Sequence, residues 1–250
     1  MSLIETESIV LKTHNLADAD KIVVLLTHDH GVVRGVAKGV KRLKSRFGSG
    51  LEPFSIVRAT YFEKEAVELV SIQNIDLIES FFAAASNPDF LQKFSYLSDL
   101  LVTFSPPHDP NENLYRMVRA CIKAAAEDDA SYLAISVYFE SWILRLAGFM
   151  PDWQRCDQCS RVIEDNETAE IRSNFHLICS DCRRPCGSRA VDSVQRAIFT
   201  GVRRLSPIEF VKFTNGDAER LAMLSGIFKR IISHSIGHEV RVEVSLGIGN

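Results

Sequence analysis

Residues 21–37 have the sequence KIVVLLTHDHGVVRGVA. Two runs rich in Val, Ile and Leu flank the segment HDHG at 28–31, whose Asp and Gly are typical turn residues. Short apolar runs with many β-branched residues, bounded by turn signals, are typical of strands. We therefore predict strands at 21–27 and 32–37 with a turn between them.

The same pattern continues on both sides of this segment. Further strands are predicted at 8–12, 54–62 and 66–73, and Gly, Asn, Asp or charged residues separate them. Five short strands in fewer than 80 residues fit a small closed or partly closed barrel, because closure protects the edges of so small a sheet. An OB-type barrel is the first interpretation. A five-stranded SH3-like barrel fits nearly as well, and periodicity does not separate the two.

Helical periodicity follows the strands. Apolar residues recur every three or four positions in 88–104, and helices are also predicted from Asn111 or Asn113 to about 126, at 130–147, at 191–202 and at 217–234. The fold class is therefore multidomain α+β, with an α-helical body. The expected domains are an N-terminal barrel at 1–78, a helical domain at 79–150, a cysteine-rich module at 151–188, and C-terminal helices at 189–250 that complete the helical domain.

Composition excludes several classes of protein. The 250 residues carry 29 Lys and Arg against 32 Asp and Glu, so the net charge of −3 gives no overall field toward nucleic acid or acidic lipid. No apolar run approaches the ~18 residues that a membrane span needs. The acidic N-terminus lacks the pattern of a signal peptide, so we expect a cytoplasmic protein with no membrane partner.

The strongest chemical signal is a pair of CxxC motifs. Five of the six cysteines lie within 156–186, and nineteen residues separate Cys156-Asp-Gln-Cys159 from Cys179-Ser-Asp-Cys182. Two such knuckles supply four thiolates at the corners of a tetrahedron, which Zn²⁺ prefers. The ribbon 161–178 is expected to form a short β-hairpin. Cys186 lies outside the four-ligand pattern, either as a spare ligand or as a free thiol. Four cysteine ligands leave no open position for water, so the predicted zinc is structural.

A basic segment follows the third predicted strand. Lys38, Lys41, Arg42, Lys44 and Arg46 place five cations in nine residues with no acid between them, and Gly39 is expected to keep the loop flexible. Such a loop can follow a phosphate backbone, and Phe47 or Phe54 is a candidate for stacking on bases. A solvated charged loop is the alternative.

Two further groups of cations are candidate partner sites. Arg116, Arg119 and Lys123 share one face of the helix after Pro110 and are a hypothetical dock for an acidic peptide; the favoured alternative is that they neutralise neighbouring acids. A second group of arginines follows the cysteines and could face nucleic acid, an acidic partner or solvent: Arg183, Arg184, Arg189, Arg196, Arg203 and Arg204.

No catalytic pattern is present in the sequence. The glycines of 35–41 do not match a P-loop, and neither a GxSxG elbow nor an HExxH helix occurs. The His-x-Glu of zinc deaminases is also missing. We therefore predict a protein that is not an enzyme and has no nucleotide cofactor.

Four stretches together resemble one protein family. They are DADKIVVLLT at 18–27, GVVRGVAKGVKRLKSRFG at 31–48, LEPFS at 51–55 and FESWILRLAGFMP at 139–151. They closely resemble the bacterial RecO family of recombination mediators, in order and over the whole chain. The resemblance implies an N-terminal OB-fold, a helical body and an embedded zinc module that stabilises the fold.

The resemblance also implies a function in DNA repair and recombination. The family binds single- and double-stranded DNA and anneals complementary strands without nucleotide hydrolysis. Its implied partners are RecR, the acidic C-terminal tail of single-stranded DNA-binding protein and, through these, RecA, in the bacterial cytoplasm and nucleoid. Cys156, Cys159, Cys179 and Cys182 match the family's zinc ligands. The five loop cations match its DNA-contacting loop, to which we add Arg34 as an expected contact. The alternative is a non-enzymatic protein–protein adaptor with a structural zinc module that binds acidic partners.

Overall fold

The computed structural model describes residues 2–16, 18–42, 45, 47–63, 68–183 and 189–237. The chain divides into two compact units, one ending at Asp129 and the other beginning at Ala130. This division falls inside the expected helical domain 79–150. Among the described residues, no helix is both long enough and apolar enough to cross a membrane.

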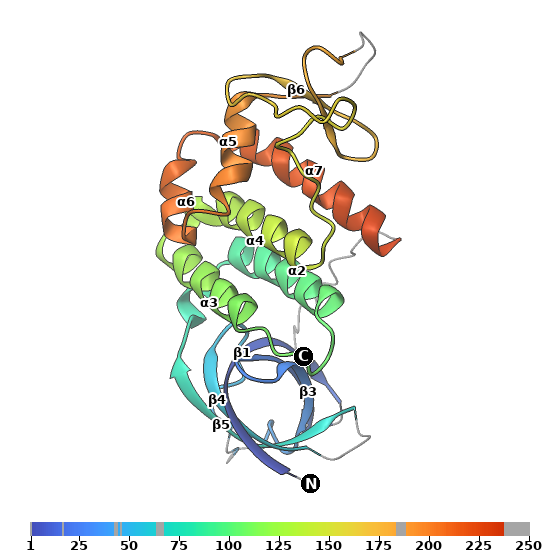
Figure 1. Cartoon of the computed structure of the whole chain (residues 1–250). Coiled ribbons are helices and arrows are strands. Elements are labelled where there is room, and N and C mark those ends of the chain that lie inside the picture. The colour runs from blue at the N-terminus through green and yellow to red at the C-terminus, as the bar shows by residue number, and fades with distance from the viewer. Residues whose placement is uncertain are drawn as a thin grey trace. The chain divides into compact units, whose positions relative to one another are not determined.

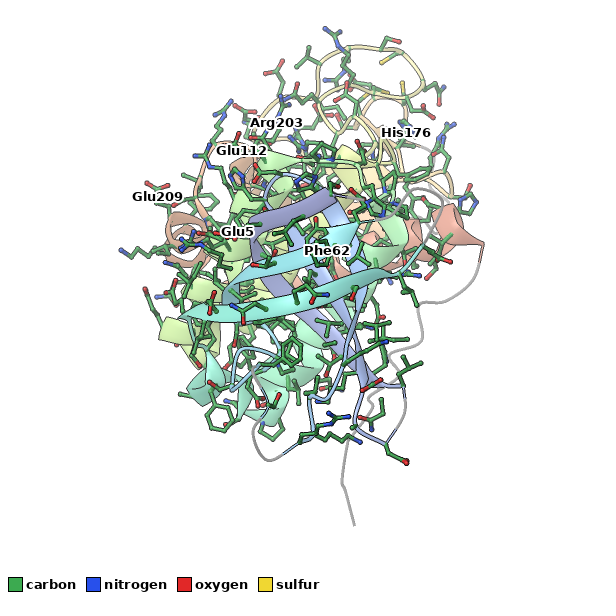
Figure 2. The ribbon with its side chains drawn as sticks, turned by 90° about the horizontal axis from the view of Figure 1, so that it is seen from below. Glu5, Phe62, Glu112, His176, Arg203 and Glu209 are labelled. Atoms are coloured by element: carbon green, nitrogen blue, oxygen red, sulfur yellow. The ribbon has the colours of Figure 1, made fainter. Side chains whose placement is uncertain are left out.

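The first unit contains a closed barrel of five strands in the order β1-β2-β3-β5-β4. Its neighbouring strands are antiparallel except for β3 and β5, which pair in parallel through Gly35 and Val70. β1 also pairs with β4, which closes the barrel; Figure 2 labels Glu5 and Phe62 on these two strands. The strands are β1 (Ser2–Asn15), β2 (Lys21–Thr27), β3 (Gly31–Ala37), β4 (Ile56–Glu63) and β5 (Val70–Glu79).

The predicted strand at 8–12 is longer in the structure, and this strand, β1, contains a β-bulge. The register with β2 shifts between Val10 and Lys12, so Val10 and Leu11 are both buried. The bulge breaks the strict alternation of inward and outward residues that a regular strand shows. The first two positions of the last predicted strand, 66–73, lie outside the described residues. The observed strand β5 begins at Val70 and extends past the predicted end to Glu79.

Helices next to the barrel complete the first unit (Figure 1). Asn87 caps α2 by accepting a hydrogen bond from the Asp89 amide, and Asn111 caps α3 in the same way. The structure thereby selects Asn111 over Asn113. Phe54 attaches α2 to the barrel through its contact with Phe90, 5.7 Å between ring centroids. These helices are α1 (Phe82–Ala85), α2 (Pro88–Phe104) and α3 (Glu112–Glu127).

The second unit combines helices with a small three-stranded sheet. α4 packs against α7, and the loops around β6 lie beside α5 and α7 (Figure 1). Trp153 joins the sheet region to α5: its ring stacks on Phe199 at 4.5 Å, and its Nε1 donates to the Phe175 carbonyl. The elements are α4 (Tyr132–Leu146), β6 (Ala169–Ile171), β7 (Leu177–Ile178), β8 (Arg189–Val191), α5 (Ser193–Gly201), α6 (Pro207–Phe213) and α7 (Ala218–Ile236), after a 3₁₀ turn at Asp129–Ser131.

All five predicted helices are present; α2 matches its predicted range, and the ends of the others shift by one or two residues. Helix α6 was not predicted, although its signal is in the sequence: Ser206 and Glu209 form a capping box around Pro207. Gly148 ends the α4 segment with φ of 76°, as its position before Pro151 predicts.

Candidate functional site

The two CxxC motifs converge on one cluster in the second unit. The Sγ atoms of Cys156, Cys159, Cys179 and Cys182 all lie within 4.8 Å of one another. The β-hairpin of β6 and β7 brings the second motif back to the first, as the sequence predicted for this ribbon. Cys159 and Cys179 are 3.8 Å apart between Sγ atoms. A tetrahedral metal with bonds of about 2.3 Å to sulfur spaces its ligands by about 3.8 Å, so the cluster has the dimensions of a metal site.

Hydrogen bonds from backbone amides also favour the thiolate form of Cys156, which is the form that binds a metal cation. Burial by itself raises the pKa of the Cys156 thiol, but backbone donors, led by Cys179, lower that pKa to about 6. The Cys179 amide donates to Cys156 Sγ at 3.4 Å. Hydrogen bonds with the Cys159 and Cys179 thiols raise the pKa of Cys182. Thiols this close together lose all their protons only when a cation compensates the charge, so this donor set fits a soft divalent metal such as zinc. Cys186 lies outside the described residues.

A half-buried carboxylate connects the two knuckles. Glu167 accepts hydrogen bonds from the Arg161 guanidinium, from the Ser180 amide at 2.7 Å and from the Ser180 hydroxyl at 2.7 Å. Arg161 follows the first knuckle by two residues, and Ser180 lies inside the second. Outer hydrogen bonds of this kind orient metal ligands. Nothing in the CxxC spacing indicated Glu167.

The basic segment begins as a turn directly after β3. Lys38, Lys41 and Arg42 are exposed, and within the described part of the chain none of the three forms an ion pair with a carboxylate. Arg34 lies on β3, where Glu68 approaches it at 3.8 Å. Lys44 and Arg46 lie outside the described residues. Three of the six predicted DNA contacts thus lie together in the turn after β3, without an ion pair to any described carboxylate.

The prediction that Phe47 or Phe54 stacks on bases is wrong. Both side chains are 2% exposed. Phe47 is part of the barrel core, and Phe54 packs on Phe90 and Phe94 of α2. Burying these two rings stabilises the fold because it removes their apolar surface from water, whereas rings exposed for stacking would remain hydrated.

The three cations of α3 are all paired. Arg119 Nη1 lies 2.5 Å from Glu7 Oε1 of β1, and Lys123 Nζ lies 3.0 Å from Glu79 Oε2 of β5. Arg116 pairs more loosely with Glu112, which Figure 2 labels, at 3.8 Å. Arg119 and Lys123 therefore join α3 to the barrel, and an acidic ligand would have to compete with two carboxylates. Their role in binding an acidic peptide stays a prediction.

The arginines after the cysteines have different environments. Arg196 is 7% exposed and donates to the carbonyls of Ile163, Glu164 and Glu167, so it holds the cysteine-rich loops on α5. Arg183 pairs with Glu170 at 2.8 Å. Arg203, labelled in Figure 2, and Arg204 are exposed in the connection between α5 and α6. Arg184 lies outside the described residues.

A pocket of about 610 Å³ lies between these loops and helices α5 and α6. Among the described residues, the buried Nε of Arg196 has no hydrogen-bond partner, and Arg196 contributes to the pocket lining. Two exposed arginines, Arg155 and Arg204, and one exposed acid, Asp165, also line the pocket. The half-exposed ring of Phe213 forms part of its wall. Further lining residues are Trp153, Val162 and Phe199. Sequence reasoning missed this pocket, because its walls come from segments up to 60 residues apart.

Comparison with known proteins decides the family. The family model described as "Recombination protein O N terminal" matches residues 1–81, and the one described as "Recombination protein O C terminal" matches residues 93–241. The chain belongs to the RecO family. The basic segment after β3 falls within the N-terminal match, and both cysteine knuckles fall within the C-terminal match, so the two separate candidate sites are covered by different family models.

Individual relatives carry the same family name. The "DNA repair protein RecO" of Koribacter versatilis (strain Ellin345) is 30% identical over 185 residues, 72% of each chain. That of Bifidobacterium longum (strain DJO10A) is 33% identical over 64% of this chain and 67% of its own. That of Myxococcus xanthus (strain DK1622) is 25% identical over 96% of both chains. This RecO family member is therefore assigned to DNA repair and recombination, and its cysteine cluster is compatible with zinc.

Proposed function

We propose that this protein is a DNA-binding recombination mediator that binds single- and double-stranded DNA and anneals complementary strands. The observation that carries the proposal is the group of three exposed cations after β3 that pair with no described carboxylate, in a chain of the RecO family. We further propose that the barrel is an OB-fold; its strand order and the parallel pairing of β3 with β5 support this over the SH3-like alternative.

The proposed mechanism is charge neutralisation. Two DNA strands repel each other through their phosphates, and cations on the protein release counterions and lower that repulsion. Lys38, Lys41 and Arg42 then hold one backbone while its bases remain free to pair. Since the buried Phe47 and Phe54 do not supply stacking, binding of this kind has little sequence preference and depends steeply on salt.

The metal in this proposal is one structural Zn²⁺. Four cysteine ligands close the tetrahedron, so no coordination position is left for water or substrate. Cys156, Cys159, Cys179 and Cys182 would hold the ion and keep the loops around β6 folded. The protein then acts without catalysis and without a nucleotide cofactor, as a cytoplasmic protein associated with the nucleoid.

The proposed protein partners are RecR, the acidic C-terminal tail of single-stranded DNA-binding protein and, indirectly, RecA. With RecR, the protein would help to load RecA onto single strands covered by that binding protein. An acidic peptide that ends in apolar residues suits the pocket near α5 and α6, because Arg155 and Arg204 flank apolar walls there. The pocket is the better of two proposed sites, since Arg119 and Lys123 on α3 are already paired.

Annealing of two complementary labelled oligonucleotides, followed at two salt concentrations with and without protein, tests the function. Acceleration that weakens as salt rises is the expected result. If DNA is neither bound nor annealed at low salt, the mediator function is refuted. The adaptor that binds acidic proteins then becomes the better explanation of the same basic surfaces.

A further inference from the structure

The basic segment after β3 is held to the barrel at three points. The amide of Gly39 donates to Asp20 Oδ1 at 2.8 Å, and the amide of Lys41 donates to the Ala19 carbonyl at 3.2 Å. Between these two bonds, Val40 packs against the hydrophobic core of the barrel. Residues 39–41 are therefore attached to the turn between β1 and β2 and to the barrel interior.

The turn that holds the segment is itself closed by Asp20. The carbonyl of Asp20 accepts a hydrogen bond from the Leu16 amide at 3.0 Å, while its carboxylate reaches across to Gly39. Gly39 has φ of 75°, a left-handed conformation that favours glycine, and the Arg42 amide donates back to the Gly39 carbonyl at 3.2 Å. At residues 39–42, the expectation that Gly39 makes the loop flexible is therefore wrong, because these residues form a hydrogen-bonded turn.

We propose that Asp20 is a positioning residue of the DNA interface, which fixes Lys38, Lys41 and Arg42 in one arrangement before DNA arrives. This inference rests on the proposed function. A flexible cationic loop loses backbone entropy when it binds, whereas a loop that is ordered in advance does not, and it therefore binds more tightly. Asp20 supplies this order through a charge-assisted hydrogen bond to the Gly39 amide.

Removal of the Asp20 side chain has two opposing effects on DNA binding. Asp20 is an acid close to a surface that binds phosphates, so electrostatics alone predicts that its removal strengthens DNA binding. Positioning predicts the opposite for Asp20→Ala, which loses the acceptor for the Gly39 amide. Asp20→Asn separates the two effects, because its side-chain oxygen still accepts that hydrogen bond while the negative charge is gone.

The experiment measures the dissociation constant for a single-stranded oligonucleotide with the 250-residue chain and three variants. We expect Asp20→Ala to weaken binding about three- to tenfold, the effect of removing one charge-assisted hydrogen bond that orders the loop. Asp20→Asn should bind as well as the wild type or better. Asp18→Asn is the matched control: Asp18 is exposed in the same turn, and among the described residues its side chain has no hydrogen-bond partner, so removing its charge should only strengthen binding.

A second measurement does not depend on DNA. Trypsin cleaves after Lys38, Lys41 and Arg42, and mass spectrometry locates the cuts. Asp20→Ala should be cleaved in this segment several times faster than the wild type, while Asp18→Asn and Asp20→Asn should not. If Asp20→Ala does not fold, hydrogen exchange of the wild type decides: the amides of Gly39 and Lys41 should exchange at least about tenfold slower than unstructured amides.

The outcomes distinguish the inference from the function on which it rests. If the wild type binds DNA and Asp20→Ala binds equally tightly or more tightly with unchanged cleavage, Asp20 has no positioning role and the mediator function stands. If the wild type binds no DNA, the mediator function fails, and cleavage and exchange still show whether Asp20 holds the segment. Free exchange at Gly39 and Lys41 overturns the inference outright.

Discussion

The guanidinium of Arg161 forms two parallel hydrogen bonds with the carboxylate of Glu167, Nη1 to Oε2 at 2.9 Å and Nη2 to Oε1 at 2.8 Å. The same carboxylate accepts from the amide of Ser180 in the second knuckle. Arg161 also approaches Asp181 at 3.0 Å. The two cysteine motifs are thus held together by a network that is independent of any metal.

Loss of this network should weaken metal retention. Glu167→Gln keeps the size of the side chain but removes the charge that pairs with Arg161, and should destabilise the protein by about 1 kcal/mol, since the pair is partly exposed. We expect a lower melting temperature and faster loss of zinc to a chelator. Glu164→Gln, an exposed acid three residues earlier, is the control. Equal zinc release from both variants would show that Glu167 does not support the metal site.

The same pair predicts a dependence of stability on pH. The Arg161 hydrogen bonds are the main cause that lowers the pKa of Glu167 to about 2 from an ordinary value of 4.5. A depressed pKa in the folded state stabilises the protein above the unfolded-state value, and this contribution disappears as pH falls from about 4.5 to about 2. Denaturation of wild type and Glu167→Gln should therefore differ at pH 6 and converge toward pH 2, within roughly this window. A constant difference across the range would contradict the assignment.

The four clustered cysteines should bind one zinc per chain. Cys156→Ser or Cys179→Ser should abolish stoichiometric zinc and lower the melting temperature, because each removes a buried ligand. Cys186→Ser should retain zinc, as should Cys121→Ser, whose thiol is buried in α3 of the other unit. Elemental analysis of protein purified without chelator checks these four variants. If zinc were lost only in Cys186→Ser, the assignment of the four ligands would have to be revised to include Cys186.

Charge reversal in the basic segment should reduce annealing. Lys41→Glu with Arg42→Glu should weaken DNA binding at least about tenfold and reduce the slope of log affinity against log salt by about one for each phosphate that the protein no longer neutralises. Lys212→Glu, an exposed cation on α6, changes the net charge at a distant place in the sequence and serves as the control. Unchanged annealing in the double variant removes the segment from the DNA interface.

The two proposed sites for an acidic peptide can be separated by mutation. Arg155→Glu with Arg204→Glu should weaken the binding of an acidic peptide with an apolar C-terminus about tenfold or more, because two favourable charges become repulsive. Arg116→Glu should have a smaller effect, since Arg116 is exposed and already near Glu112. Fluorescence anisotropy with a labelled peptide measures both. A loss of affinity confined to Arg116→Glu would place the peptide on α3.

Some features follow from local sequence because local physics decides them. Asn87 and Pro88 begin a helix wherever an apolar stripe follows, and two CxxC turns bring their thiols into pairs without help from the rest of the chain. The strands at 21–27 and 32–37 also match the structure closely, because their apolar runs and the turn between them lie within 17 residues. The family resemblance, too, was visible in the sequence.

Other features depend on contacts between residues far apart in the chain, which no local pattern encodes. Burial of Phe54 against α2 removed it from the surface, and Glu7 and Glu79 pair with Arg119 and Lys123 of α3. The acceptor for Gly39 is Asp20, nineteen residues earlier. The sequence alone determined which residues carry charge and which are suited to bind metal, because side-chain chemistry belongs to the residue. Which of those charges stay unpaired depends on the folded arrangement, because pairing and desolvation are set by the groups that the fold places next to each side chain.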